Sequence, residues 1–107
     1  MALSDERAAR NEALFREVNE EVARLEQRLE GQATLFVCEC ALDSCVERVP
    51  LSMELYEEVR SNPRRFVVKP GHEVEAVERV VSAGDGYVIV EKTALAGQIA
   101  ERTDPRT

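Results

Sequence analysis

The sequence predicts an α+β fold in which a long N-terminal helix packs on a small antiparallel sheet. Two observations predict it: residues 4–30 have helical periodicity, and short runs rich in β-formers follow Gly31. At 107 residues the chain is long enough for one modest core and too short for two. We therefore expect a single domain over 1–107, with an α+β core at 34–92 and a C-terminal helix at 93–103.

The segment 4–30 has the residue spacing of an amphipathic helix. Its apolar residues recur every three or four positions, and three glutamates each precede an arginine by four positions, which is the favourable order. Ser4 is suited to cap the start of the helix and Gly31 to close its end. The apolar stripe, which Leu14 widens, consists of Phe15, Val18, Val22, Leu25 and Leu29.

This stripe fits two arrangements. It is either the inner face of a helix packed on its own sheet, or a surface for a protein partner or homodimer through helix 4–30. In a parallel homodimer Glu21 and Glu26 would face each other and repel, whereas an antiparallel pair would set Glu21 near Arg28. Because barely two heptads are present, we favour packing within the chain.

Short β-rich runs predict a hairpin and a third strand. Thr34–Cys38 and Val46–Val49 are expected to pair across the polar loop 39–44, and Phe66–Val68 follows as a strand that ends before Pro70. The stretch 74–82 fits a helix or a strand. A hairpin of about 77–82 with 87–91 is favoured, because the turn-forming residues 83–86 separate the two runs.

Two shorter helices complete the prediction. Ser52 is expected to cap a helix over 53–61, which ends at Asn62-Pro63. Thr93 is expected to cap the last helix. The residues expected to face inward are Leu55, Tyr56 and Val59 on the first of these helices, and Leu95 and Ile99 on the second.

All three cysteines and the only histidine of the chain are candidate metal ligands: Cys38, Cys40, Cys45 and His72. Three thiols and one imidazole form a complete tetrahedral donor set for structural zinc. At a strand end, Cys38 and Cys40 are expected to point the same way, and the turn is expected to return Cys45 beside them. His72 arrives from the loop after the third strand. The predicted fold therefore contains a zinc-bound β-hairpin, with Zn²⁺ as the cofactor.

Several alternatives remain open at this point. The spacing C-x-C-x4-C differs from the common C-x2-C pattern, so buried thiols, a redox sensor, an iron–sulfur cluster or another thiophilic metal compete with zinc. If His72 were not a ligand, a catalytic zinc with Glu39 or Glu73 as general acid/base would remain, but the deaminase pattern H-x-E…P-C-x-x-C is missing. A backbone N–H or an arginine such as Arg48 is suggested as a hydrogen-bond donor to the site.

The acidic residues near the cysteines bear on the choice between ligands and redox thiols. Glu39, Asp43 and Glu47 are expected to raise the pKa of the thiols, which favours metal ligands over reactive thiolates.

Charge and hydropathy exclude other classes of partner. With 14 basic against 21 acidic residues and a net charge of −7, the chain is unsuited to bind nucleic acid or an anionic membrane surface. No apolar run approaches the ~20 residues that span a bilayer, and the N-terminus is charged where a signal peptide is apolar. We expect a cytoplasmic, non-enzymatic structural-zinc module for protein–protein interaction, regulation being one such role. A thiol or zinc redox sensor is the alternative, and a small zinc hydrolase or deaminase ranks lower.

Several phrases of the chain resemble a known group of sequences. They are Phe15–Asn19, Phe36–Cys40, Phe66–Glu73, Tyr87–Lys92 and Glu101–Pro105. Together they look like small uncharacterised bacterial proteins of high-GC genomes that carry C-x-C-x4-C followed by P-G-H-E. The resemblance covers most of the chain. It implies a self-contained protein, and it carries over no catalytic residue.

Overall fold

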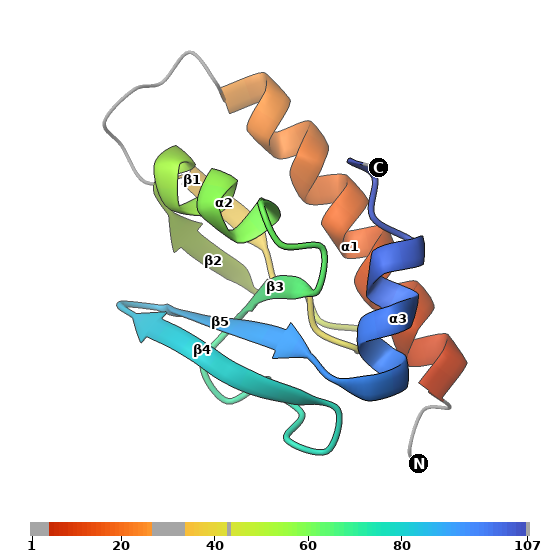
Figure 1. Cartoon of the computed structure of the whole chain (residues 1–107). Helices are drawn as coiled ribbons and strands as arrows, with labels where there is room; N and C mark the ends of the chain where they lie inside the picture. Colours follow the sequence, from red (N-terminus) through yellow and green to blue (C-terminus); the bar gives the residue numbers. More distant parts are fainter. Residues whose placement is uncertain (1–4, 27–33, 43, 107) are drawn as a thin grey trace.

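The computed structural model describes residues 5–26, 34–42 and 44–106, which form an α+β fold, as predicted (Figure 1). The described strands form two antiparallel sheets, one of order β1-β2 and one of order β3-β5-β4. Helix α1 packs against β1 and α3, and α2 packs against β3. The elements are α1 (Asp5–Glu26), β1 (Thr34–Val37), β2 (Arg48–Leu51), α2 (Met53–Arg60), β3 (Arg65–Val68), β4 (Glu78–Gly84), β5 (Tyr87–Lys92) and α3 (Ala94–Arg102).

Both predicted hairpins form. β1 and β2 pair from Thr34↔Leu51 to Val37↔Arg48, so the second strand starts two residues later than expected. Residues 74–82 fitted a helix or a strand in the sequence, and from Glu78 on they form strand β4. This strand pairs with β5 and carries a bulge between Val80 and Ser82. The turn between them contains Gly86 at a φ of 79°, a conformation that glycine adopts without steric cost.

The second helix matches its prediction, and the third matches it in part. The Ser52 hydroxyl accepts a hydrogen bond of 3.1 Å from the Leu55 N–H, and Tyr56 and Val59 are buried. In α3, Thr93 stands at the N-cap without a capping hydrogen bond from its side chain. Leu95 is 57% exposed, so its inward placement was wrong.

Close packing explains why small residues, and not Leu95, form the buried side of α3. Gly97 and Ala100 are the buried residues of α3. A Cβ atom on Gly97 would lie 2.5 Å from Arg64 Nη1 and 3.0 Å from the carbonyl oxygen of Lys92. The helix therefore approaches the sheet too closely for a leucine on that face.

The buried face of α1 differs from the predicted apolar stripe. Val18 and Leu25 are 39% and 76% exposed, and Phe15 and Val22 are only half-buried. Leu29, Ser4 and Gly31 lie outside the described residues. The expected packing of the stripe on the sheet is therefore wrong for Val18 and Leu25. The side chains of α1 that are buried are Glu12, Arg16, Asn19 and Ala23.

Individual polar contacts make this buried face possible. Arg16 is fully buried, and its guanidinium lies 4.4 Å from the centre of the Phe66 ring. Its two terminal nitrogens donate to the carbonyls of Pro63 (2.6 Å) and Ala100 (2.7 Å). A buried charge is tolerated when hydrogen bonds replace water, so hydrophobicity alone did not reveal this face.

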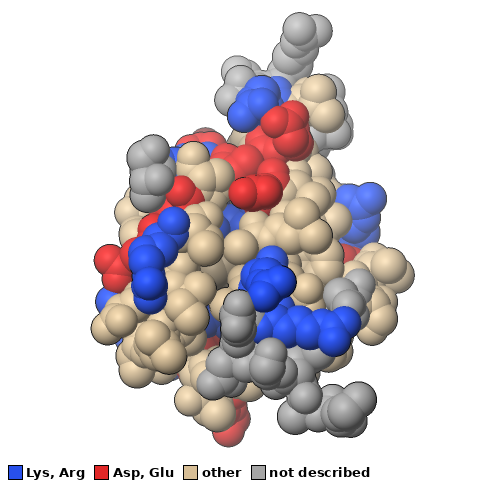
Figure 2. Space-filling view, turned by 90° about the vertical axis from the view of Figure 1, so that its right-hand side faces the viewer, with Lys and Arg blue, Asp and Glu red and all other residues tan. Residues whose placement is uncertain are grey.

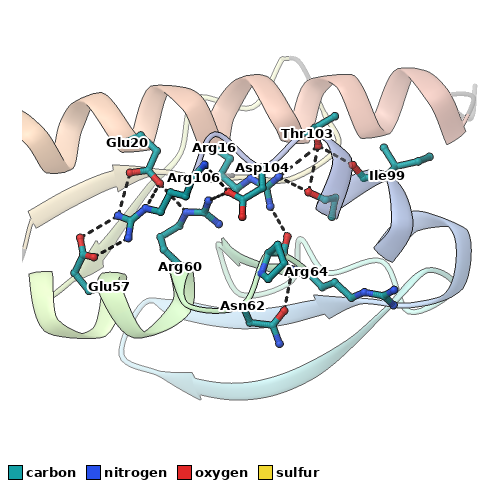
Figure 3. Close-up of polar contacts among 12 residues, drawn as sticks. Arg16, Glu20, Glu57, Arg60, Asn62, Arg64, Ile99, Thr103, Asp104 and Arg106 are labelled. Atoms are coloured by element: carbon teal, nitrogen blue, oxygen red, sulfur yellow. Dashed lines mark hydrogen bonds and ion pairs between the residues drawn. The ribbon is translucent and has the colours of Figure 1, made fainter.

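A second arginine network closes the fold at its C-terminal end (Figure 3). Arg60 of α2 is buried and pairs with Glu20 of α1 (2.9 Å) and with Asp104. Arg106 pairs with the same Glu20 and with Glu57 of α2. Residues after α3 thus join α1 to α2.

Candidate metal centre

The four candidate ligands meet at one point. The Nδ1 atom of His72 lies 3.6 Å from the Sγ atom of Cys38 and 3.6 Å from that of Cys45. One ligand atom from each of Cys38, Cys40, Cys45 and His72 lies within 4.8 Å of all the others. The cysteines are free thiols, and two of them, Cys38 and Cys40, are buried. These four residues form a possible metal-binding cluster.

Local backbone structure brings the ligands together. The N–H of Cys38 donates to the carbonyl of Glu47 (3.0 Å), which extends the β1–β2 pairing by one step to the first ligand. The N–H of Cys45 donates to the carbonyl of Leu42 (3.1 Å), so the loop turns tightly before the third thiol. The N–H of His72 donates to the carbonyl of Lys69 (2.9 Å), and Gly71 supplies the positive φ of 92° that this turn requires.

The side chain of Glu39, the residue between Cys38 and Cys40, lies apart from the two thiols. Glu39 is 1% exposed, and its carboxylate accepts hydrogen bonds from Asn19 Nδ2 (2.7 Å) and the N–H of Val67 (3.0 Å). The N–H of Glu39 donates to the carbonyl of Val67 (2.8 Å). Glu39 therefore joins the ligand segment to β3 and to α1, while Cys38 and Cys40 face the cluster.

Comparison of the chain with protein-family models, with curated proteins and with solved structures gave no match. Among the described residues, no helix is both long and apolar enough to cross a membrane.

Two of the donor separations match those around a tetrahedral ion. Zinc–sulfur bonds of ~2.3 Å and zinc–nitrogen bonds of ~2.0–2.1 Å at tetrahedral angles imply a sulfur–nitrogen separation of about 3.6 Å. Both Sγ–Nδ1 distances of His72 have this value. Nδ1 is therefore the imidazole atom placed to bind an ion.

A backbone donor supports the first thiol. The N–H of Lys69 lies 3.1 Å from Cys38 Sγ, a contact that would stabilise the negative charge of a thiolate ligand. The arginine suggested for this role is elsewhere: Arg48 donates to the carbonyl of Leu35 (3.2 Å). That suggestion was wrong, because Arg48 reaches across the β1–β2 pair rather than along the loop.

The thiols differ in acidity. The pKa of Cys40 is lowered to about 5, mainly by a hydrogen bond from Cys38. Burial acts to raise this pKa, but a hydrogen bond with His72 lowers it further. The same hydrogen bond with Cys40, together with burial, raises the pKa of Cys38. Burial raises the pKa of Cys45. The expected uniform rise caused by carboxylates was therefore wrong for Cys40, because the neighbouring thiols and imidazole act at shorter range.

The two carboxylates considered as general acid/base are engaged elsewhere. The carboxylate of Glu39 is bound by Asn19 and Val67, and that of Glu73 accepts from the N–H of Gly71 (3.1 Å and 3.2 Å).

Sequence reasoning missed Asn19. Its amide binds both backbone groups of Val37 as well as the carboxylate of Glu39. An asparagine within the helical periodicity of 4–30 was the only available signal, and such a residue is more often solvent-exposed.

Proposed function

We propose that the chain is a cytoplasmic, non-enzymatic structural-zinc module, with Cys38, Cys40, Cys45 and His72 as the ligands. The observation that carries the proposal is the meeting of all four donors within 4.8 Å of one another, with the imidazole Nδ1 at 3.6 Å from two thiols. Three sulfurs and one nitrogen suit Zn²⁺ in its structural, four-coordinate form.

A closed ligand set favours a structural role over catalysis. Catalytic zinc keeps one position open for water or substrate, whereas four protein donors fill a tetrahedron. With three thiolates and a neutral imidazole, the loaded site has a net charge of about −1, which the Lys69 N–H partly offsets. A reducing compartment such as the cytoplasm keeps these thiols available for metal.

The free energy expected from zinc binding is large enough to decide whether the chain folds. Structural zinc contributes apparently ~10–16 kcal/mol in small peptides, and whole domains are stable by only ~5–15 kcal/mol. The ligands join the β1–β2 loop to the segment after β3, two parts of the fold that Glu39 also connects. Loss of the ion should therefore weaken the junction between the two sheets.

The outer face of α1 is the surface through which we propose a protein partner or a second copy binds. Leu14, Val18 and Leu25 are 55%, 39% and 76% exposed. They recur at helical spacing, and Glu17 and Glu21 lie beside them. An apolar stripe with charged neighbours is typical of helix-in-groove or helix–helix recognition.

The first test measures metal content. We expect one zinc per chain by elemental analysis, and Co²⁺ substitution should give the intense visible bands of a tetrahedral thiolate site. Cys40→Ser and His72→Ala should lose zinc and lower the melting temperature together. Glu73→Gln, which changes the residue next to His72 without removing a donor, should keep both. Folding that survives His72→Ala with an exchangeable water on the metal would overturn the closed site.

A second test addresses the partner surface. Val18→Glu and Leu25→Glu should abolish self-association in light scattering, or capture of a partner from the native host, with zinc content unchanged. Glu54→Ala on the exposed side of α2 is the control.

A redox sensor is the second candidate function, favoured by the lowered pKa of Cys40 beside the half-exposed Cys45. Hydrogen peroxide would take two electrons from two thiolate ligands and, with two protons from the solvent, form two molecules of water, while the two sulfurs form a disulfide and release the metal. Peroxide-triggered zinc release that a dithiol reverses would support this function. Zinc retention at millimolar peroxide would exclude it.

A further inference from the structure

A pocket of about 470 Å³ lies beside the metal cluster without including any of its ligands. Its walls come from the start of α1, the loop after Cys40, the segment after His72 and the start of α3. Figure 2 shows the side of the molecule on which α1 and α3 lie, where uncharged surface extends between the charged groups. Volumes of this size are typical of small-molecule sites.

The described side chains that line the pocket are apolar apart from Glu12 and the hydroxyl of Thr93. Alanines and larger aliphatic side chains together form most of the wall. These larger side chains are Leu42, Val74, Val77, Leu95 and Ile99. Leu42, Val74 and Leu95 are also exposed, at 53%, 40% and 57%. Such a surface loses its contact with water when an apolar molecule binds, which favours binding.

Among the described residues that line the pocket, Glu12 is the only charged one, and it is 7% exposed. Its Oε2 atom pairs with the buried ammonium of Lys92, which also pairs with Glu78. Within the described residues no hydrogen bond to Glu12 Oε1 is found. The other oxygen of Glu78 accepts from the N–H of Val74 (2.6 Å), so the free carboxylate oxygen is that of Glu12.

The charges of Glu12, Glu78 and Lys92 do not balance. Two buried carboxylates share one ammonium, which leaves an excess of one negative charge at the edge of an apolar pocket. Burial raises the pKa of Glu12, although Lys92 acts to lower it, so the single ammonium does not compensate for the lost water. A second cation next to Glu12 would compensate for it.

We propose that the pocket binds a small organic cation, an alkylammonium whose apolar body lies along the aliphatic wall and whose ammonium pairs with Glu12. A carboxylate ligand would meet the excess negative charge, and a neutral ligand would leave it uncompensated. The inference goes beyond the zinc module, because it rests on Glu12 and the pocket wall and not on the metal ligands.

The test is a titration of the zinc-loaded full chain followed by ¹H–¹⁵N NMR, with three probes of matched shape at constant ionic strength. The probes are 3-methylbutan-1-amine, 3-methylbutan-1-ol and 3-methylbutanoate. The amine should give saturable shifts centred on residues of the pocket wall. The alcohol should bind at least tenfold more weakly, and the acid should give no saturable shift.

Two variants separate charge from shape. Glu12→Gln keeps the side-chain shape and leaves Lys92 paired with Glu78, and it should weaken amine binding at least tenfold. Ala8→Leu leaves every charge in place, keeps a strong helix former at this position and fills part of the pocket, and it should also lose binding. Glu54→Gln, on the exposed side of α2, should bind the amine like the unchanged chain.

Three results would overturn the proposal: an alcohol that binds as tightly as the amine, unchanged affinity in both pocket variants, or shifts that lie away from the pocket. If Glu12→Gln fails to fold, Ala8→Leu and the three probes still decide the outcome. Zinc content, measured on the same samples, keeps failure of the metal site distinct from failure of the pocket.

Discussion

The side-chain amide of Asn19 donates a hydrogen bond of 2.7 Å to the carboxylate of Glu39, the residue between Cys38 and Cys40. The same amide donates to the carbonyl of Val37 (2.8 Å), and its oxygen accepts from the Val37 N–H (2.8 Å). Asn19 thus provides the hydrogen bonds that a neighbouring strand would provide, from the middle of a helix. Through these bonds α1 holds both neighbours of the first thiol, Val37 by its backbone and Glu39 by its carboxylate.

Removal of that amide should loosen the ligand segment. Asn19→Ala leaves the backbone groups of Val37 and one carboxylate oxygen without these partners, at a cost of about 3 kcal/mol in the free energy of unfolding. Urea unfolding of the zinc-loaded protein measures this cost, and transfer of zinc to a chelator should become faster. Gln98→Ala, an exposed change on α3, is the control. A cost below about 1 kcal/mol would contradict the positioning role of Asn19.

The buried ammonium of Lys92 should be essential to the core. Lys92→Met leaves Glu12 and Glu78 buried without their counter-ion and should cost about 3–5 kcal/mol of unfolding free energy. Replacing all three residues by apolar ones of similar volume should recover most of that loss, because no unpaired charge remains. Thermal and urea unfolding compare the single and triple variants. Equal stability of the two would show that charge is not the cause.

Tyr56→Phe should not destabilise the protein. The ring of Tyr56 stacks on Phe36 with centroids 4.3 Å apart, and its buried hydroxyl has no hydrogen-bond partner among the described residues. Phenylalanine keeps the stack and removes the unsatisfied group, so the free energy of unfolding should stay the same or rise by up to about 1 kcal/mol. Phe36→Ala, which removes the stack, should cost about 3–5 kcal/mol in the same urea assay. A large loss in Tyr56→Phe would reveal a partner for the hydroxyl.

Acid should weaken the link between the C-terminal residues and α1. Burial raises the pKa of Glu20, but hydrogen bonds from Arg106 and Arg60 outweigh it, and the pKa is lowered overall. A hydrogen bond from Arg106 likewise lowers the pKa of Glu57. A carboxylate with a lowered folded-state pKa stabilises the fold above its ordinary pKa of about 4.5, and this stability is lost as the pH falls through the folded-state value.

The measurement compares urea unfolding at about pH 6 and about pH 3.5 in the unchanged chain and in Arg106→Gln. Stability should fall toward the lower pH in both proteins, and the fall should be smaller in the variant, since one of the two arginines that act on Glu20 is gone. Parallel curves would show that Arg106 does not contribute. Titration of other groups is common to both proteins and cancels in the comparison.

Local patterns were sufficient where the chain contacts itself over short distances. The cap at Ser52 and the turn at Gly86 depend on residues within a few positions of one another, and the hairpin around the cysteines pairs neighbouring strands, from Thr34↔Leu51 to Val37↔Arg48. The convergence of His72 with the thiols was predictable for a different reason: the chain contains only three cysteines and one histidine, and one ion can use all four.

Partners distant in sequence could not be predicted from local patterns. The hydrophobic spacing of α1 identified a helix but not its buried face, because that face is formed by Glu12, Arg16 and Asn19, whose partners lie in other elements. Each polar group is buried at a cost that only a specific, distant partner offsets. By itself the sequence determined the helices, the strands and the donor set, since these follow from periodicity, turn chemistry and composition. Tertiary structure alone decided which side of α1 faces the core and how Asn19 and Glu39 hold the thiols, because polar residues that distant partners bury leave no hydrophobic pattern in the sequence.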